Sequence, residues 1–208
     1  MSTPIRRSPA ARLSSRRGAV FVEEAGWEIP ASYGNDAAER AAIRDRVVIA
    51  DITARAKVDI RGRIPETLSS PADTVLARIS AEWVVLLGAP DAEGRLIRAI
   101  EPVAGSGAMV TDVTHLFAGV ALAGPALPEL VERATSWDLS TLAPGAATGA
   151  PIAEVRALLV RRDLPFPVLE VFVATEFGRY AWETLSGIVS GLGGGPVGWQ
   201  ALRAEGWR

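Results

Sequence analysis

The segment Met109–Thr141, MVTDVTHLFAGVALAGPALPELVERATSWDLST, contains the clearest succession of structural elements in this sequence. An apolar run at Leu116–Ala123 has the length and composition of a buried strand. Gly124-Pro125 interrupts that run and predicts a turn. The next apolar residues recur at helical spacing: Leu127, Leu130, Val131 and Ala134. We therefore predict a strand, a turn and a helix over Ala126–Ala134 at the centre of the fold.

The remaining elements follow from the same periodicities. Alternating polar and apolar residues predict strands, and apolar residues three or four apart predict helices. Further strands are predicted at 19–22, 47–52, 57–61, 82–87, 95–100, 154–162 and 168–173. Further helices are predicted at 36–46, after Asp73 and at 175–189. The second half thus has the order β-α-β-β-α of a split βαβ (ferredoxin-like) unit, so we predict an α+β fold of antiparallel sheets with helices packed on one face.

Composition divides the chain into three parts. Residues 1–18 are rich in arginine and serine and lack acids, which predicts a flexible, exposed N-terminal arm. An organelle transit peptide is the alternative interpretation of the same composition. Gly105-Ser106-Gly107 is typical of a flexible joint. We therefore expect an N-terminal subdomain at 19–105 and a split βαβ subdomain at 106–208.

Charge and residue usage exclude several classes of function. The formal net charge of the 208 residues is −2, with 22 basic and 24 acidic side chains, which argues against a nucleic-acid partner. The sequence contains no cysteine, so disulfides, thiolate nucleophiles and cysteine-ligated metals are excluded. A single histidine, His115, excludes a histidine-cluster metal site, and no apolar run is long enough to span a membrane. We expect no metal, no membrane partner and a cytoplasmic location.

A glycine-rich pattern and the single histidine could each be functional, but we interpret both as structural. Gly193–Gly198 contains the pattern G-x-G-x-x-G, but a predicted helix precedes it, whereas a dinucleotide-binding loop follows a strand. We interpret this segment as a helix-to-strand connection. His115 would need a neighbouring acid to act as a general base, and the sequence nominates none, so we interpret it as structural.

A series of segments resembles the glycine-cleavage T-protein (aminomethyltransferase) family. Phe21–Gly34, FVEEAGWEIPASYG, resembles the opening of that family. Other segments that resemble the family follow in the family's order: Ala42–Arg44, Ala50–Thr53, Lys57–Gly62, Val120–Pro125, Asp138–Ser140, Leu169–Val173 and Val197–Gly206. The resemblance covers residues 20–206 and implies a truncated T-protein-like fold, because the family's C-terminal barrel has no counterpart.

The sequence differs from the family at the positions of the family's catalytic aspartate and folate-binding glutamate. The catalytic aspartate of the family lies in a G-G-x-x-D-D type segment, whereas the corresponding region here contains Gly88-Ala89-Pro90-Asp91. The glutamate that grips the pterin falls within Asp163–Phe166, where Phe166 takes its place. An apolar ring cannot accept hydrogen bonds, and each unpaired pterin donor would cost about 1–3 kcal/mol. We therefore expect no catalytic residue in this chain.

A short T-protein-like chain without these acids resembles the gamma subunit of heterotetrameric sarcosine oxidase. This resemblance implies a non-catalytic small subunit of a folate-linked, amine-oxidising complex, an oxidoreductase of one-carbon metabolism whose flavin and NAD are bound only in partner subunits. The alternative is a stand-alone tetrahydrofolate-binding, aminomethyltransferase-like protein with an altered active site, in which Asp91 or Asp112 supplies the acid. A third interpretation is a binding module for another small amine or one-carbon ligand.

Four side chains are candidates for contact with folate or with a partner: Trp27, Tyr33, Arg203 and Glu205. Trp27 and Tyr33 share one Pro/Gly-rich loop and offer flat rings, although buried tryptophan more often fills a core. Arg203 and Glu205 match the arginine and glutamate of the family's LRLEAG run. A guanidinium at that position can stack on a flat ring or pair with a carboxylate. Tetrahydrofolate is the ligand that the resemblance implies for them.

Overall fold

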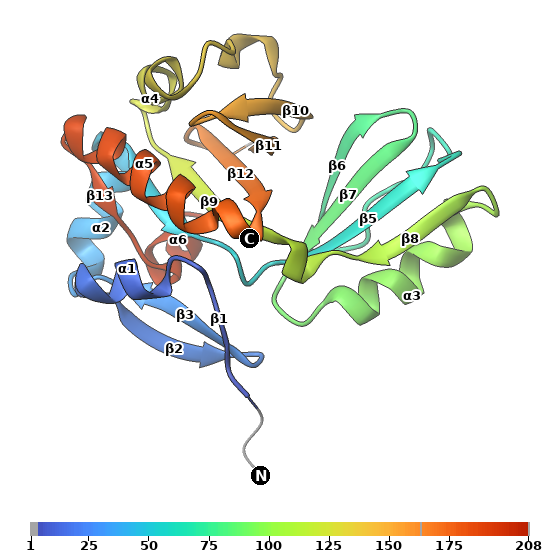
Figure 1. The fold of residues 1–208 in the computed structure, drawn as a ribbon, viewed down its shortest axis with the longest axis horizontal. Coiled ribbons are helices and arrows are strands. Elements are labelled where there is room, and N and C mark those ends of the chain that lie inside the picture. The colour runs from blue at the N-terminus through green and yellow to red at the C-terminus, as the bar shows by residue number, and fades with distance from the viewer. Residues whose placement is uncertain (1–3, 163, 208) are drawn as a thin grey trace.

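The computed structural model describes residues 4–162 and 164–207, so positions 1–3 of the predicted arm and Asp163 lie outside the described residues. A six-stranded sheet and a four-stranded sheet stand side by side, and the N-terminal strands form a smaller three-stranded sheet (Figure 1). Most of the strand pairs are antiparallel. The predicted α+β class built on antiparallel sheets is confirmed.

The six-stranded sheet has the strand order β10-β11-β12-β9-β4-β13. Its strands are β4 (Val48–Asp51), β9 (Phe117–Ala123), β10 (Ala147–Ile152), β11 (Val155–Arg162), β12 (Val168–Ala174) and β13 (Gly195–Pro196). Helices α4 (Leu127–Ala134) and α5 (Gly178–Gly191) pack on one face through an apolar cluster that includes Leu130 and Leu185. Strand β9 and helix α4 confirm the strand and helix predicted from the central segment.

The turn between β9 and α4 depends on Gly124. Its φ is +118°, and a Cβ there would lie 2.3 Å from the carbonyl oxygen of Arg46. Only glycine meets both conditions, because a side chain would clash and would also strain the backbone. The close approach places the start of α4 against the end of helix α2 (Asp36–Asp45).

The other face of the six-stranded sheet is covered by α2, by helix α6 (Trp199–Ala204) and by the four-stranded sheet. Phe172 of β12 and Leu87 of the four-stranded sheet belong to this second apolar cluster. Among the described residues, three 3-10 helices lie in connections between longer elements: η1 (Thr114–Leu116), η2 (Leu139–Thr141) and η3 (Thr175–Phe177). The two larger sheets therefore share one core.

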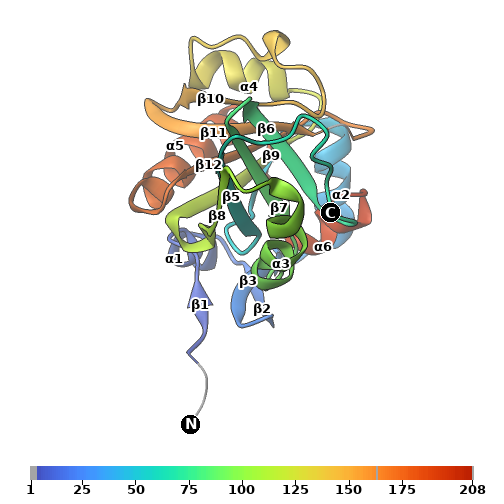
Figure 2. The ribbon, with the colours of Figure 1, turned by 90° about the vertical axis from the view of Figure 1, so that its right-hand side faces the viewer.

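The four-stranded sheet, which faces the viewer in Figure 2, has the strand order β6-β7-β5-β8. Its strands are β5 (Ala56–Gly62), β6 (Val75–Ser80), β7 (Trp83–Gly88) and β8 (Ala108–Asp112). Helix α3 (Glu93–Ala104) covers the face away from the six-stranded sheet and buries Leu96 and Ile100. A third apolar cluster fills the space between α3 and this sheet.

Two predicted elements of this region are wrong. Residues 95–100, predicted as a strand, lie within α3, whose buried residues Leu96, Ile100 and Ala104 recur every four positions. The helix predicted after Asp73 is strand β6, in which Ala77 joins the core shared by the two larger sheets. In both cases packing against β7 and β5 decides between two short apolar patterns that sequence spacing leaves ambiguous.

The N-terminal residues 4–18 are built into the fold, which corrects the expectation of a flexible arm. Strand β1 (Arg6–Arg7) pairs in parallel with β3 (Trp27–Ser32), which also pairs with β2 (Val20–Glu24). Helix α1 (Ala11–Arg16) buries Ala11 and Ser14. The small side chains of Ala11 and Ser14 allow this close packing. The arginine-rich composition of the segment did not predict it.

The division expected near residue 105 differs from the structure. Gly105 connects α3 to β8, and both elements belong to the four-stranded sheet and its helix. The chain instead passes between the two larger sheets at 52–55 and at 113–116. Strand β4 from the first half pairs with β9 from the second half, so the halves share one sheet. Strand β10 lies between the predicted helix at 126–134 and the predicted strand at 154–162, where the sequence pattern predicts no strand.

Within the described part of the chain, none of the helices is long and apolar enough to cross a membrane.

Candidate functional site

A pocket of about 300 Å³ opens between the four-stranded sheet and helix α6. Residues from four distant segments form its walls: Arg55, Asp73, Gly88, Ala89, Pro90, Trp199, Arg203 and Trp207. The loop after β7 provides one side, and α6 with the residues that follow it provides the other. The pocket therefore exists only because the two larger sheets are held next to each other.

A buried charged cluster lies beneath this pocket. Arg55 is 2% exposed, and its Nη1 donates to Oε1 of the fully buried Glu170 at 2.7 Å. The indole Nε1 of Trp207 donates to the same oxygen at 2.8 Å, and Arg162 donates to it as well. Burial lowers the pKa of the Arg55 guanidinium, and the negative charge of Glu170 opposes that shift. One carboxylate oxygen thus holds two guanidinium groups and an indole in place.

Glu170 retains unused acceptor capacity. Its second oxygen, Oε2, is buried and has no hydrogen-bond partner among the described residues. A buried acceptor without a partner costs free energy, because it has lost its water and gained no replacement. The carboxylate serves the two arginines and Trp207 through Oε1 alone, so it is a structural anchor for the pocket floor.

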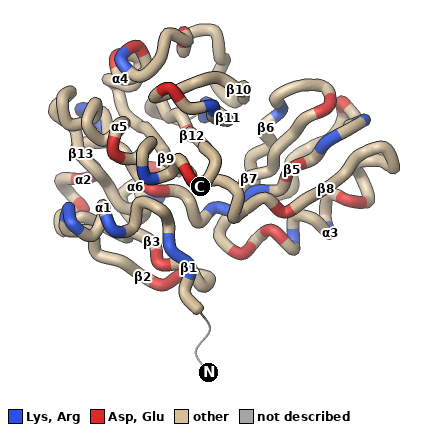
Figure 3. The backbone as a smooth tube through the Cα atoms, viewed as in Figure 1, with Lys and Arg blue, Asp and Glu red and all other residues tan. Residues whose placement is uncertain are grey.

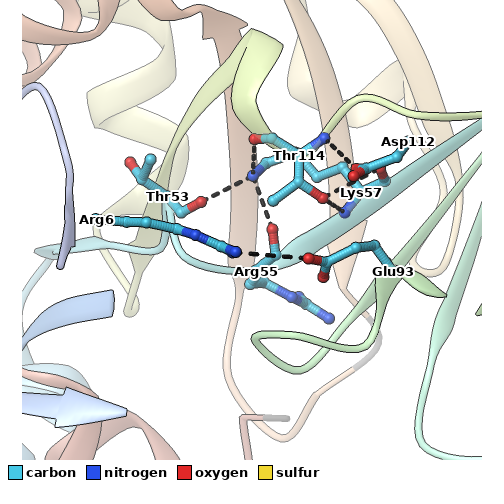
Figure 4. A network of polar contacts seen from close by, with 7 residues as sticks. All are labelled: Arg6, Thr53, Arg55, Lys57, Glu93, Asp112 and Thr114. Carbon is cyan, nitrogen blue, oxygen red and sulfur yellow. Dashed lines mark hydrogen bonds and ion pairs between the residues drawn. The ribbon is translucent and has the colours of Figure 1, made fainter. Parts of the chain in front are cut away.

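Lys57 fixes the two chain segments that connect the larger sheets (Figure 4). Its ammonium is buried and donates to the carbonyl oxygens of Thr53 at 2.8 Å, Arg55 at 2.8 Å and Thr114 at 3.2 Å. Thr53 and Arg55 belong to the first connection, and Thr114 belongs to the second. Burial, followed by the neighbouring Arg55 charge, lowers the pKa of Lys57 to about 7, while Asp51 and Asp112 oppose the shift.

The rim of the pocket combines indoles with a paired arginine. Trp199 and Trp207 meet edge to face with ring centroids 5.1 Å apart. The guanidinium of Arg203 lies 4.8 Å from the Trp199 ring centroid and donates two hydrogen bonds, of 2.9 and 2.7 Å, to Glu24. The hydrogen bond from Arg203 holds the pKa of Glu24 below its ordinary value. Flat indole walls suit a planar ligand, and the Arg203 guanidinium beside them is already paired with Glu24.

The four sequence-predicted residues do not converge on one site. Arg203 lines the pocket, whereas Glu205, which directly follows the same helix, is paired with Arg40 and Arg44 of α2. Hydrogen bonds from these two arginines lower the pKa of Glu205. Glu205 therefore joins α6 to α2, and it is absent from the residues that line the described pocket.

The other two predicted residues lie at the N-terminal sheet. Trp27 is 3% exposed and stacks on His115 with ring centroids 5.5 Å apart. Burial raises the pKa of Tyr33 to about 12, and its backbone N–H donates to Glu39 at 2.6 Å. Neither residue is among those that line the described pocket. The stacking with Trp27 gives His115 a structural contact.

The acids considered for catalysis have structural surroundings. Asp112 accepts a hydrogen bond of 2.9 Å from the backbone N–H of Thr114 and so caps the η1 turn. Asp91 has a φ of +62° in the loop after β7, next to the pocket residue Pro90. Phe166, which the resemblance aligns with a folate-binding glutamate, packs against the core between the sheets. Asp73 is the acidic member of the described pocket lining.

Sequence reasoning missed Arg55, Trp199 and Trp207, which form most of the pocket's polar and aromatic character. One signal was available for the buried cluster. Glu170 stands in the middle of the apolar strand VLEVFVA, and a glutamate buried in such a strand needs a cationic partner. No spacing in the sequence indicates that this partner is Arg55, which lies 115 residues away.

Comparisons with known proteins agree with this architecture. No family model matches the sequence. The chain is 26% identical over 226 aligned positions to an aminomethyltransferase of Streptomyces coelicolor, covering 95% of this chain and 61% of the relative. It is 28% identical to an aminomethyltransferase of Saccharopolyspora erythraea, covering 92% of this chain and 60% of the relative. The chain thus spans about three fifths of the length of these curated relatives.

Two solved structures share the fold. Aminomethyltransferase T of the glycine cleavage system from Bartonella henselae matches with a TM-score of 0.78 and 16% identity, over 97% of this chain and 62% of that chain. A heterotetrameric sarcosine oxidase from Corynebacterium sp. U-96 matches with a TM-score of 0.65 and 16% identity, over 90% of this chain and 96% of that one. The chain is therefore T-protein-like: it is similar in sequence and fold to aminomethyltransferases, and in fold to a sarcosine oxidase chain.

Proposed function

We propose that this chain is a small, non-catalytic subunit of a sarcosine-oxidase-like, folate-linked complex that oxidises amines. The extent of the structural match supports this proposal. The match covers nearly the whole of both this chain and the sarcosine oxidase chain, but only 62% of the aminomethyltransferase. The structural match therefore extends over more of the sarcosine oxidase chain than of the aminomethyltransferase.

The chemistry of the pocket also supports a non-catalytic role. Proton transfer needs an acid or base within hydrogen-bond reach of the reacting group. Glu170 is fully buried beneath the pocket and Asp112 accepts a hydrogen bond from a turn, and neither is among the residues that line the described pocket. Asp73 is the acid of the described lining that a catalytic role would have to use. In this proposal flavin and NAD are bound by partner subunits, and the complex resides in the cytoplasm.

Purification of the tagged chain from its native host under mild conditions tests this function. The proposal predicts that a flavoprotein co-purifies at fixed stoichiometry and that sarcosine bleaches its visible absorbance. The same tag on an unrelated protein of similar size serves as the control. A chain that purifies alone, with no sarcosine-dependent change in any co-purifying flavin, would contradict the proposal.

The pocket itself favours one alternative, a stand-alone tetrahydrofolate-binding protein related to the aminomethyltransferases. Indole walls and the Arg203 guanidinium suit a flat ring that carries carboxylates. Titration calorimetry of the isolated chain with tetrahydrofolate tests this alternative. It predicts tight binding that Arg203→Ala weakens and Arg95→Ala, on the exposed side of α3, leaves unchanged.

An altered transferase also requires an acid near the ligand. Asp91 and Asp112 are the sequence candidates, and Asp91 adjoins the pocket loop. Folate-dependent turnover that survives Asp91→Asn and Asp112→Asn together would reject transferase activity. Circular dichroism of the double variant controls for loss of the Thr114 cap that Asp112 provides.

A further inference from the structure

The N-terminal segment of the chain carries an unusual excess of positive charge. Residues 1–18 contain five arginines, and the first acidic residue is Glu23, although the whole chain has a formal net charge of −2. Helix α1 buries Ala11 and Ser14 against the fold, so its arginines face outward. The basic residues of this region are visible on α1 and β1 in Figure 3.

Three of the arginines on this side of the molecule surround one cavity. Arg12 and Arg16 of α1 and Arg179 of α5 line a cavity of about 130 Å³, with Pro9 and Leu13 as its apolar walls. None of the described lining residues is acidic. Arginines that line one cavity are suited to bind a carboxylate, because a guanidinium group can donate paired hydrogen bonds to it.

Among the described residues, the arginines of α1 lack the ion pairs that the nearby arginines of β1 form. Arg6 pairs with Glu93 at 3.7 Å, and Arg7 pairs with Glu28 at 2.8 Å. Within residues 4–162 and 164–207, neither Arg12 nor Arg16 forms an ion pair. Arg179 contacts the exposed Glu183 on its own helix at 3.3 Å. Arg12 and Arg16 stand four residues apart on one helix, a like-charge spacing that opposes helix formation unless an anion intervenes.

Exposed apolar side chains accompany Arg179. Phe177 is 45% exposed and Tyr180 is 44% exposed, and both lie in the same turn as Arg179 at the start of α5. Leu116, 61% exposed, is close by, because Thr175 donates a 2.8 Å hydrogen bond to the carbonyl oxygen of His115. Arginine and aromatic residues are the types enriched in the centres of protein interfaces.

We propose that Arg12, Arg16 and Arg179, with Phe177 and Tyr180, form a docking surface for a partner chain that presents an acidic patch bordered by apolar side chains. We refer to these five residues as the basic docking surface. The inference rests on the proposed function, because it requires a partner subunit. The cavity admits one carboxylate side chain among three guanidinium groups, and the adjacent rings supply the apolar contact that a folded protein surface can match.

The test compares the flavoprotein that co-purifies with the wild-type chain across a set of matched variants. Arg12→Glu, Arg16→Glu and Arg179→Glu together should weaken its binding at least 30-fold, about the loss expected when a single hot spot is removed. Arg95→Glu, Arg98→Glu and Arg156→Glu change the net charge equally at exposed positions elsewhere and should leave binding unchanged. Binding is measured by surface plasmon resonance, with circular dichroism to confirm that each variant folds.

Further measurements separate the electrostatic contribution to binding from the contribution of the apolar side chains. The association rate of the wild-type chain should fall as salt is raised, and that dependence should be lost in the charge-reversed variant. Phe177→Ser with Tyr180→Ser should weaken binding about tenfold, mainly through faster dissociation. Hydrogen exchange in the complex should slow across 9–17 and 177–181.

The outcomes distinguish this inference from the proposed function. If no flavoprotein co-purifies with the wild-type chain, both are rejected. If a flavoprotein binds the wild type and the charge-reversed variant equally, the docking surface is rejected while the proposed function stands. Arginine-dependent binding of nucleic acid, with flavoprotein affinity unchanged by the substitutions, would also overturn the docking surface.

Discussion

The arginines beneath the pocket and the arginines on α1 have opposite surroundings. Arg55 and Arg162 point at one buried carboxylate, Glu170, and Arg55 is 2% exposed. Arg12 and Arg16 are exposed and form no ion pair within the described residues. A buried charge has lost its hydration and needs an ion-pair partner within the protein, whereas an exposed charge is solvated and remains available to an external partner. The buried set therefore maintains the pocket, and the exposed set is free to serve an interface.

The largest effect is expected from removing the charge of Glu170. Glu170→Gln should lower the free energy of unfolding by about 3–5 kcal/mol, because the Arg55 guanidinium would remain buried without its counter-ion. Urea denaturation followed by circular dichroism measures the change. The exposed Glu183→Gln is the matched control and should cost less than about 1 kcal/mol. A loss below about 1 kcal/mol for Glu170→Gln would show that the buried cluster is not an anchor.

Lys57 should produce the next largest effect. Lys57→Met removes the donor from three buried carbonyl oxygens, so we expect a loss of about 1–3 kcal/mol in the free energy of unfolding near pH 6, where the lysine carries its third proton. Urea denaturation at constant pH provides the measurement. An equal or greater stability of the Met variant would contradict the assigned role of the ammonium group.

The same lysine predicts how stability depends on pH. Its pKa is lowered from 10.5 to about 7 in the folded chain, so above pH 7 the unfolded state binds more protons than the folded state. Stability should therefore rise from about pH 7 to about pH 9, by at most about 1.4 kcal/mol per unit. Tyr33, whose pKa is raised from 10.0 to about 12, reverses the trend only above pH 10. Lys57→Met should lack this rise.

A smaller effect is expected at the rim of the pocket. Arg203 and Glu24 form a well-aligned but exposed pair, with side chains 44% and 38% exposed. A double-mutant cycle with Arg203→Gln and Glu24→Gln should give a coupling of about 0.2–1 kcal/mol that shrinks in high salt. A coupling above about 2 kcal/mol would mean that the rim is as tightly held as the buried cluster.

The smallest effect is expected on α1. Arg12→Gln with Arg16→Gln should change the free energy of unfolding by no more than about 0.5 kcal/mol, because neither side chain has a partner to lose within the described residues. Thermal and urea denaturation provide the measurement. A loss above about 1.5 kcal/mol would show that these arginines stabilise the fold and would remove the contrast with Arg55.

Local patterns were sufficient for part of the fold. The helical spacing of Leu127, Leu130 and Val131 and the apolar run before Gly124 located β9 and α4, because their packing follows from residues near in sequence. The two wrong predictions, a helix in place of β6 and a strand in place of part of α3, have a different cause. Each element is short, and only the neighbouring strands of the four-stranded sheet decide which of two apolar spacings is buried.

The pocket was less predictable than the fold. Arg203 was identified through a resemblance to a family. Arg55, Pro90 and Trp207 line the same pocket only because the fold places the two larger sheets next to each other. The sequence predicted that Trp27 and Tyr33 share one loop, but Trp27 is the first residue of strand β3 and stacks on His115. Tyr33 follows that strand, and its backbone N–H donates to Glu39. Contacts between distant segments leave no local pattern, and a buried glutamate in an apolar strand was the one available signal.

Native mass spectrometry of the tagged chain purified from its host tests the central claim most directly. The account predicts an assembly of fixed stoichiometry that contains this chain and a flavoprotein, and that breaks apart when Arg12, Arg16 and Arg179 are replaced by glutamate. A monomeric chain that carries tetrahydrofolate and no other protein would contradict it.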